Sequence, residues 1–379
     1  MKNVYKIEKS KFIAFIIFLL IIIETAFENT PLQHYNLLVN QIFLLVEVIL
    51  FIAFLGQEKF LKKNFYILVG LFAVFICSYF VLNSSILIRM FMFSTVVSKI
   101  SIEKSFEILF KFKTAIILFV VSLSLVGILS TNHMLVEKGI GSFMGYGLGY
   151  SHPNRLASAI IFSILCYVGW KKEKIHFLNF VSILGITLTA YYITHSRTLI
   201  YCTGILFLCF IFVKTRLFKK LIPFLGIVSF PISTAASIYI PILLLTSSGI
   251  IQKIVFEINL LFSRRFTHIE HLFLSYPIPL FGGRFDLSKM EAIFSYTVID
   301  NAYIRFLYQY GIFGLLIFGV VTTISMVILR QKKEYIWICI SLIVIIEGLL
   351  ENIYTDIGQN ILLLFWAVVI KKFFYEEKR

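Results

Sequence analysis

Arginine side chains are the residues of this 379-residue chain most clearly suited to chemistry, because several of them border or interrupt long apolar runs. A guanidinium presents a planar fork of donors that can grip a phosphate at two points. Charges inside apolar runs are costly and mark functional sites by default. We therefore predict an anionic ligand, with pairing between helices, for instance Arg89 with Glu47, as the alternative. The candidate arginines are Arg155, Arg197, Arg264, Arg265 and Arg284.

Two histidines three residues apart, His268 and His271, are the main candidates for a base, since histidine accepts a proton near neutral pH. In a helix over 257–274, Glu257, Arg264 and both histidines would share one side, opposite a row of apolar residues. Such a helix would lie on a membrane surface with its polar side towards a cavity, or towards solvent in the alternative. A third metal ligand at a diagnostic spacing is missing, so we predict no metal site.

A glycine-rich stretch over 131–153 leads into residues 150–155, which read YSHPNR. Proline suits the first turn of a helix, so we predict a helix that begins near Pro153. Free amide groups at such a helix N-terminus attract anions. The alternative is a flexible loop followed by an ordinary capped helix. The candidates here are His152, a further possible base, together with Asn154 and Arg155.

The composition determines what kind of protein holds these residues. Hydrophobic residues make up 59% of the chain, charged residues 15%, and the mean hydropathy is +0.91. Soluble domains have about 45–50% apolar and about 25% charged residues, so this chain is predicted to be a polytopic membrane protein. Cytosolic enzymes, nucleic-acid-binding proteins and disordered proteins are excluded. All five cysteines fall in apolar runs without a CxxC pair, which indicates neither disulfides nor zinc.

Twelve apolar runs are long enough, or nearly so, for the about 20 residues that a membrane-crossing helix needs. We therefore predict an all-α fold: a polytopic transmembrane helical bundle of about twelve spans that forms a single integral-membrane domain over 1–379. The predicted spans are 12–27, 37–56, 65–83, 86–98, 114–130, 154–170, 177–194, 198–213, 221–246, 302–329, 335–350 and 356–370.

Basic residues recur at every second connection and so predict the orientation. Seven segments hold 25 of the 35 lysines and arginines: 1–11, 57–64, 99–113, 171–176, 214–220, 330–335 and 371–379. By the positive-inside rule these segments and both termini are cytoplasmic. The glycine-rich loop 131–153 is then an outer loop. So is the long connection 247–301 between spans 9 and 10, which would contain the interfacial amphipathic helix.

The arginines are distributed differently from the lysines. Of the 25 cytoplasmic cations only three are arginine, whereas seven of the remaining ten are. The net charge of +15 is therefore a signal of topology, and no nucleic-acid partner is predicted. The chain has no Walker motif and no DxD pair, which excludes ATP hydrolysis and metal-dependent transfer from nucleotide sugars. Any chemistry would use a substrate that is already activated and already in the membrane, without a cofactor.

An ordered set of short motifs resembles one known family. The motifs are Ser151-His152-Pro153-Asn154, Ser196-Arg197-Thr198, Arg264-Arg265 with Phe281-Gly282-Gly283 in the long outer loop, and Asp300-Asn301-x-Tyr303 running into Tyr310-Gly311-x-x-Gly314. Their order over roughly 130–320 resembles the O-antigen ligase/polymerase superfamily. Within it, the chain is most similar to the Wzy-type polymerases of capsule, exopolysaccharide or O-antigen repeat units. Many ligase members have histidine at the position of Asp300, so this departure favours the polymerase branch.

This resemblance implies glycosyl transfer in the plasma (inner) membrane, with the active site facing the extracytoplasmic side and loop 247–301 as its catalytic loop. The donor and acceptor would be polyprenyl-diphosphate-linked oligosaccharides, and the partners would be membrane lipids, a flippase and a chain-length regulator of the same pathway. Arg197, Arg264 and Arg284 would stabilise the leaving diphosphate, and His268, His271 or His152 would act as base. The substrate-binding candidates are Arg265, Arg155, Asn154, Asp300, Asn301, Tyr303 and Glu257, of which Glu257 and Asp300 are also reserve bases.

Two other functions remain open at this point. A ligase would transfer finished glycan to a different acceptor, and the loop motifs do not exclude it. A flippase or other transporter of lipid-linked oligosaccharide also often has about twelve spans. It would place its charges along a path that reaches both faces, whereas the charges here lie mostly towards the predicted outer side.

The predicted orientation can be tested with reporter fusions. An alkaline phosphatase fused within 250–300 is expected to be active, because the positive-inside rule puts this segment outside the cytoplasm. A fluorescent protein that folds only in the cytoplasm should give no signal there and a strong one after residue 216. Cytoplasmic reporters that are active within 250–300 would contradict the topology.

Overall fold

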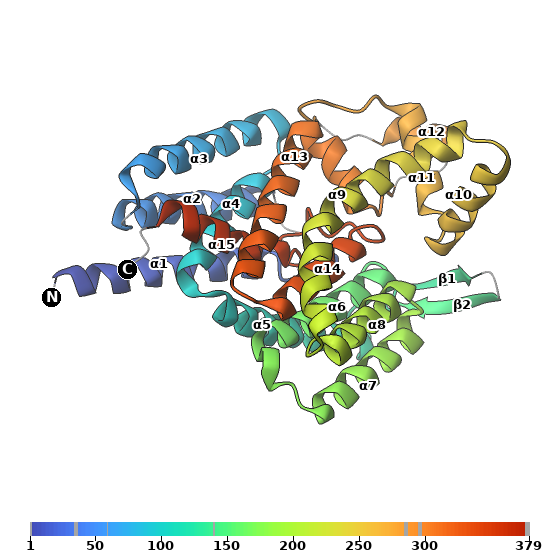
Figure 1. Ribbon diagram of the computed structural model, residues 1–379, viewed down its shortest axis with the longest axis horizontal. Helices are drawn as coiled ribbons and strands as arrows, with labels where there is room; N and C mark the ends of the chain where they lie inside the picture. Colours follow the sequence, from blue (N-terminus) through green and yellow to red (C-terminus); the bar gives the residue numbers. More distant parts are fainter. Residues whose placement is uncertain are drawn as a thin grey trace.

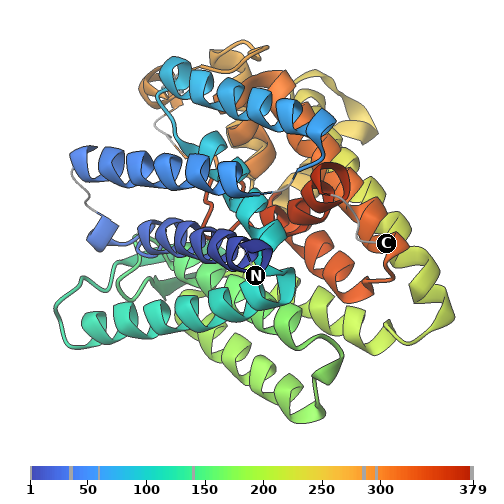
Figure 2. The ribbon, with the colours of Figure 1, turned by 90° about the vertical axis from the view of Figure 1, so that its left-hand side faces the viewer.

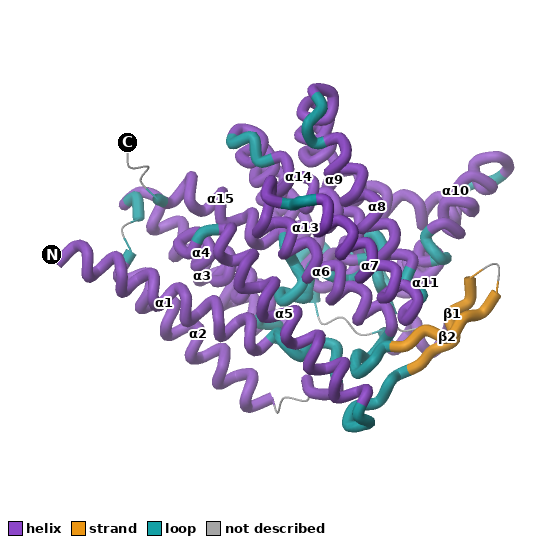
Figure 3. Tube along the Cα trace, turned by 90° about the horizontal axis from the view of Figure 1, so that it is seen from below, coloured by secondary structure: helices purple, strands orange, loops and turns teal. Residues whose placement is uncertain are grey.

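The computed structural model describes residues 2–33, 37–58, 60–138, 141–283, 287–294 and 298–375. This part of the chain contains fifteen α-helices, two short 3-10 helices and one antiparallel pair of strands. Both termini lie at one end of the molecule, whereas α10, α11 and the strand pair lie at the opposite end (Figures 1 and 3). The structure is thus mainly helical and has two chemically different ends.

Each of the twelve predicted runs contains a helix. These helices are α1 (Lys2–Glu24), α2 (Leu37–Gln57), α3 (Lys62–Leu82), α4 (Ile86–Ile100), α5 (Ile102–Leu125), α6 (Pro153–Lys171), α7 (Phe177–Thr194), α8 (Arg197–Phe212), α9 (Arg216–Thr246), α13 (Ala302–Gln331), α14 (Tyr335–Glu347) and α15 (Leu362–Phe374). Within the described residues, six helices are long and apolar enough to cross a membrane: those in α2, α3, α5, α7, α9 and α13. The structure therefore supports a helical membrane protein, and the number of twelve spans stays a prediction.

The start of α5 differs from the prediction. Residues 99–113 were expected in a cytoplasmic connection, but α5 begins at Ile102, where the Ser101 side chain accepts a hydrogen bond from the Lys104 amide. Lys113 is consequently buried on α5, with its ammonium 5.9 Å from the ring centre of Phe162. Apolar residues on either side of the lysines allow the helix to extend further than the uncharged run alone indicates.

The predicted glycine-rich loop 131–153 contains a β-hairpin, so the all-α prediction is wrong in this segment. Strand β1 (His133–Lys138) pairs antiparallel with β2 (Gly141–Tyr146), with His133 opposite Tyr146. The hairpin packs on the end of α7, where the Phe143 ring lies 5.1 Å from the His195 ring. Glycines interrupt the alternation of larger apolar residues that favours strands, so the sequence pattern did not predict this hairpin.

The single helix predicted over 257–274 is two helices, α10 (Gly249–Leu261) and α11 (Arg265–Ser275). They are separated by Ser263 and Arg264, whose φ angles are 55° and 60°. The buried Asn259 joins them, since its Oδ1 accepts a hydrogen bond from the Phe266 amide at 3.1 Å. The break separates Glu257 on α10 from the histidines on α11. The apolar row still faces inward, because Phe266 and Ile269 are buried.

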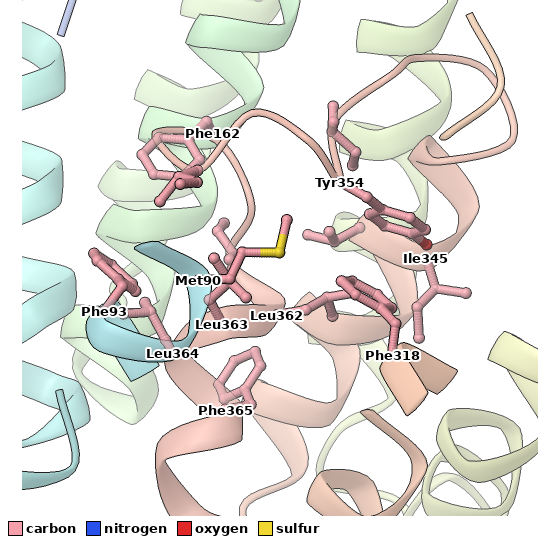
Figure 4. Close-up of a cluster of buried hydrophobic side chains, with 14 of the residues drawn as sticks. Met90, Phe93, Phe162, Phe318, Ile345, Tyr354, Leu362, Leu363, Leu364 and Phe365 are labelled. Carbon is pink, nitrogen blue, oxygen red and sulfur yellow. The ribbon is translucent and has the colours of Figure 1, made fainter. Parts of the chain in front are cut away.

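The hydrophobic core surrounds α15. Residues 362–365 at the start of this helix are fully buried, although the helix has only 13 residues. Side chains from α4, α6, α13 and α14 close around them (Figure 4). The residues labelled there are Met90, Phe93, Phe162, Phe318, Ile345, Tyr354, Leu362, Leu363, Leu364 and Phe365. α15 is thus enclosed mainly by other helices.

The basic connections meet at the end of the molecule that carries the termini, onto which Figure 2 looks. Lys99 pairs with Glu58 at 2.7 Å. Lys172 pairs with both Glu103 and Glu334, each at 3.0 Å. These contacts join the connections α2–α3, α4–α5, α6–α7 and α13–α14. The charge pattern that was assigned to one side of a membrane is therefore also coherent in space.

The predicted pairing of Arg89 with Glu47 is confirmed. Arg89 on α4 donates from Nε to Glu47 Oε2 at 2.9 Å, and its Nη1 lies 2.6 Å from Glu24 Oε1. All three side chains are almost fully buried. A buried guanidinium between two carboxylates joins α1, α2 and α4. Arg89 therefore has a structural role.

Two glycines bring residues 279–282 against α13. Gly311 interrupts that helix with φ 76° and ψ 177°. The interruption frees the amides of Ile312 and Phe313, which donate to the carbonyls of Pro279 and Leu280 at 3.0 and 3.2 Å. A Cβ on Gly282 would collide with the Gln309 carbonyl oxygen, and one on Gly311 would collide with the Leu280 carbonyl oxygen. The two backbone segments can approach each other this closely only because neither Gly282 nor Gly311 has a side chain.

Replacing Gly311 by alanine is expected to lower the free energy of unfolding by at least about 1–3 kcal/mol, the usual cost of such a backbone in a residue with a Cβ. Gly282→Ala should act similarly, because its φ is 76°. Gly204→Ala on α8 is the matched control, since nothing lies within 4 Å of the added Cβ. Thermal unfolding of the detergent-solubilised proteins measures the difference. Equal melting temperatures for all three variants would contradict the docking.

Candidate functional site

The last two predicted spans are shorter than expected because the chain between them folds back into the protein. α14 ends at Glu347 and α15 begins at Leu362, and residues 348–361 form turns and irregular backbone. The segment is largely buried, and several of its polar groups form hydrogen bonds within the protein. Tyr354 Oη donates to Tyr303 Oη at 2.8 Å, and Asn360 Nδ2 donates to the Tyr354 carbonyl at 2.9 Å. Such backbone is tolerated at membrane depth only where protein encloses it or a cavity borders it.

Glu351 of this segment is the centre of a charged cluster. Its Oε1 lies 2.9 Å from Arg265 Nη2, while Asp300 Oδ2 lies 3.7 Å from the same nitrogen. Thr198 Oγ1 contacts the same Glu351 oxygen at 3.5 Å. The Glu351 side chain is 2% exposed and that of Arg265 is 12% exposed, so their attraction is only weakly screened by water. We call Thr198, Arg265, Asp300 and Glu351 the Arg265 cluster.

The turn between α10 and α11 decides which of two adjacent arginines enters the cluster. Arg264 has a left-handed backbone and precedes α11, and its side chain is exposed. Arg265 is the first residue of α11, and its guanidinium is turned inward to Glu351. The sequence-based choice of Arg264 as the principal phosphate ligand is therefore less suited to the geometry than Arg265.

His152 and Arg155 approach the cluster from the start of α6. His152 caps this helix, as predicted, and its Nδ1 accepts a hydrogen bond from the Asn154 amide at 3.0 Å. Burial lowers the pKa of His152, Asp300 raises it, and Arg155 and Arg265 lower it. In the neutral ring Nδ1 accepts this hydrogen bond and Nε2 carries the proton, so Nε2 is a hydrogen-bond donor.

His268 approaches the cluster from α11. The pKa of His268 is lowered to about 4: burial lowers it most, His271 and Arg265 also lower it, and Asp300 raises it. The ring is therefore neutral near pH 7. His271 is placed differently: its ring stacks on Phe294 of α12 (Ser288–Phe294) with 3.9 Å between the ring centres. The predicted pair is thus divided, with His268 nearer the charged groups.

Arg305 on α13 adds a third guanidinium, which interacts electrostatically with Arg155. Arg155 also interacts with Glu351, which links it to the Arg265 cluster. The guanidiniums of Arg155 and Arg265 thus lie near the carboxylates of Asp300 and Glu351, and that of Arg305 lies near Arg155. Such a surplus of positive charge in a poorly hydrated place favours an anionic ligand.

Two predicted substrate ligands have internal roles. Asn301 is 1% exposed and caps α13, with Oδ1 accepting from the Ile304 amide at 3.0 Å and Nδ2 donating to Ser237 Oγ at 3.0 Å. Tyr303 is fully buried and donates to the Ile345 carbonyl at 2.7 Å. These two residues hold Asp300 and segment 348–361 in place, so they position the site.

The other candidates lie outside the cluster or beside it. Arg197 is half-buried as the first residue of α8, next to Thr198, and Asn154 is half-buried on α6. Glu257 is exposed on α10. Arg284 lies outside the described residues. Glu351 was not among the candidates predicted from the sequence, although the polar residues at the end of one predicted span and the start of the next were a signal: Glu347, Glu351, Asp356, Gln359 and Asn360.

Within the described ranges, no three His, Cys, Asp or Glu side chains are grouped so that they could hold a metal ion. Comparison of the chain with protein-family models, with curated proteins and with solved structures finds no match. The function is therefore inferred from the chemistry of the Arg265 cluster and from its place in the fold.

The pairing of Arg265 with Glu351 can be measured by a double-mutant cycle. Arg265→Gln leaves a buried carboxylate without its partner, and breaking a buried ion pair typically costs about 3–5 kcal/mol of unfolding free energy. The double variant Arg265→Gln/Glu351→Gln should recover much of this loss. Arg264→Gln is the control and should stay within about 0.5 kcal/mol of wild type. Denaturation in mixed micelles gives the four values, and additive single effects would contradict the pairing.

The neutral state of His268 predicts a pH dependence of stability. Because its folded pKa of about 4 is below the ordinary value of 6.5, the unfolded chain binds more protons between these values. The contribution of His268 is thus fully present above pH 6.5 and is lost as pH falls towards 4. The melting temperature of wild type should fall more steeply over this range than that of His268→Gln. Parallel curves would exclude a buried neutral ring.

Proposed function

We propose that the protein is a polysaccharide polymerase that joins oligosaccharide repeat units carried on a polyprenyl diphosphate at the outer face of the plasma membrane. The observation that carries this proposal is the grouping of the Arg155 and Arg265 guanidiniums with Asp300 and Glu351, with Arg305 near Arg155, at the end of the molecule opposite the basic connections. If the basic connections are cytoplasmic, this cluster lies near the outer leaflet, where lipid-linked repeat units are presented.

The transfer needs a stabilised leaving group and a proton acceptor. The acceptor hydroxyl oxygen bonds to the anomeric carbon of the donor, the bond from that carbon to the diphosphate oxygen breaks, and the hydroxyl proton passes to a base. Negative charge develops on the diphosphate. We assign its stabilisation to Arg155 and Arg265. Arg197, which is next to Thr198 of the Arg265 cluster, and the Nε2–H of His152 are further donors. Removing one such preorganised donor typically costs about 10²–10³ in rate.

Asp300 is the base that the geometry favours. Its side chain is 21% exposed, whereas that of Glu351 is 2% exposed, so a substrate reaches Asp300 more easily. Arg265 lies closer to Glu351 than to Asp300, at 2.9 against 3.7 Å, so the Asp300 carboxylate is the less strongly paired of the two. His268 is the reserve candidate, since its neutral ring can accept a proton but its low pKa makes it a weak base.

An apolar groove supports a substrate with a long hydrocarbon chain. It has a volume of about 630 Å³ and lies between α9 and α13, where Thr234 and Thr323 are its polar lining residues. Ile278, which precedes the stretch docked on Gly311, is also one of its lining residues. Both helices are candidate membrane spans, so the groove would open to lipid. An isoprenoid tail held there would keep its diphosphate near the start of α13, where Asp300 lies.

A transporter of lipid-linked oligosaccharide is the second candidate, because segment 348–361 is a buried irregular stretch between two short helices. Interrupted helices of this kind form substrate sites in many transporters. Glu347 and Glu351 at its start are both buried. A transporter moves its substrate between two compartments, whereas a polymerase acts on substrate in a single micelle. A reaction in detergent therefore separates the two functions.

The test is reconstitution of the purified protein with synthetic polyprenyl-diphosphate repeat units in detergent, with the products resolved on a gel. A ladder of longer chains is expected without added metal or nucleotide. Arg265→Ala and Asp300→Asn should reduce its formation by about 10²-fold or more. Arg264→Ala, the exposed neighbour, should keep at least half the activity.

Deletion of the gene distinguishes a polymerase from a ligase. Cells without a polymerase accumulate single lipid-linked units, whereas cells without a ligase accumulate long lipid-linked chains. Long chains in the deletion strain would overturn the proposal in favour of the ligase. A failure of both assays, with export of single units lost, would favour the transporter.

A further inference from the structure

A second polar cavity opens at the opposite end of the molecule, among the basic connections. It has a volume of about 1220 Å³ and lies where the connections α6–α7, α8–α9 and α13–α14 meet. One part of its wall is apolar and comes from α7 and α8, with Phe180, Phe210 and Val213 as lining residues. The remainder is strongly basic. The Arg265 cluster contributes no residue to this lining, so the cavity is a separate feature.

The charges of this cavity are not balanced. Its lining contains two glutamates, Glu103 and Glu334, and six lysines: Lys171, Lys172, Lys174, Lys214, Lys219 and Lys333. Both glutamates pair with Lys172, whose ammonium also lies 3.4 Å from the ring centre of Trp337. The two acids are thereby committed to a single lysine. Among the residues of the described lining, no further carboxylate remains to pair with the other five lysines.

The lysines and the aromatic residues differ in their exposure to water. Lys214, Lys219 and Lys333 are exposed at the mouth, where their ammonium groups can reach a ligand. Trp170 is half-buried beneath Lys171, whose ammonium lies 3.8 Å from its ring centre. Tryptophan beside lysine is typical of the level at which lipid headgroups meet hydrocarbon. The cavity thus combines a cationic rim with an apolar wall.

We propose that this cavity binds the headgroup of an anionic phospholipid. The phosphate would lie among the rim lysines, and the upper acyl chains would lie against Phe180, Phe210 and Val213. Basic pockets between transmembrane helices are suited to such headgroups. A lipid is favoured over a soluble phosphate, because a soluble anion would leave the apolar wall unfilled. α7, which supplies part of this wall, is itself a candidate membrane span.

Native mass spectrometry of the purified full-length protein in a neutral detergent tests the proposal. The probes are short-chain phosphatidylglycerol and, as the uncharged counterpart, phosphatidylcholine of the same chain length. Phosphatidylglycerol should be retained at a concentration at least tenfold lower. The triple variant Lys214→Gln/Lys219→Gln/Lys333→Gln should lose this preference. The single variants Lys214→Gln and Lys333→Gln should each weaken it about threefold, and they replace the triple variant if it aggregates.

The matched control is Lys104→Gln/Lys371→Gln/Lys372→Gln, which removes the same charge at the same end but outside the cavity. It should keep the preference for phosphatidylglycerol. An equal loss in this control would show diffuse surface attraction and overturn the proposal. Displacement of the lipid by millimolar inorganic phosphate would identify a soluble anion as the ligand and would also overturn it. Equal retention of both lipids by the wild-type protein would do the same.

Discussion

The ion pair between Arg265 and Glu351 is the interaction on which the arrangement of the site depends. It joins α11, which follows a left-handed turn, to an irregular segment between two short helices. Neither charge could stay in so poorly hydrated a place without the other, because burying an unpaired charge is far more costly than burying a pair. Asp300 contacts the Arg265 side of the pair at 3.7 Å, and Thr198 contacts the Glu351 side at 3.5 Å.

Irregular backbone inside a membrane protein needs enclosure, and two features provide it. Segment 348–361 is held by hydrogen bonds from Asn301 to the Leu349 carbonyl, between Tyr354 and Tyr303, and from Asn360 to the Tyr354 carbonyl. The stretch that ends at Gly282 is held by the amides that Gly311 frees on α13. Both attachments involve α13. This helix therefore connects the charged cluster, the apolar groove and the stretch that ends at Gly282, and a substrate that occupies all three would have its parts aligned by a single helix.

The two ends of the molecule treat positive charge differently. At the end with the termini, lysines form a solvated ring of connections and a cavity with a cationic rim. At the other end, arginines are drawn into the protein beside carboxylates. Lysine is a strongly hydrated point charge, whereas a guanidinium is less hydrated and bonds in a fixed plane. The first end is thus suited to adsorbing lipid headgroups, and the second to holding a reacting phosphate in one orientation.

The sequence by itself determined the helical membrane class, a helix in each apolar run, the spatial grouping of the basic connections and the pairing of Arg89 with Glu47, since these follow from apolar length and charge pattern. It also brought His152, Arg155, Arg265, His268 and Asp300 into consideration. Only the tertiary structure decided between Arg264 and Arg265, because a two-residue left-handed turn reverses which side chain faces inward. Only the tertiary structure placed Glu351 at the centre of the Arg265 cluster, because the partners of this residue are distant in sequence. From the sequence alone, a polar stretch beside apolar runs is expected to be exposed to water. The hairpin at 133–146 was hidden for a related reason: glycine content is local, whereas strand pairing and its support by α7 are not.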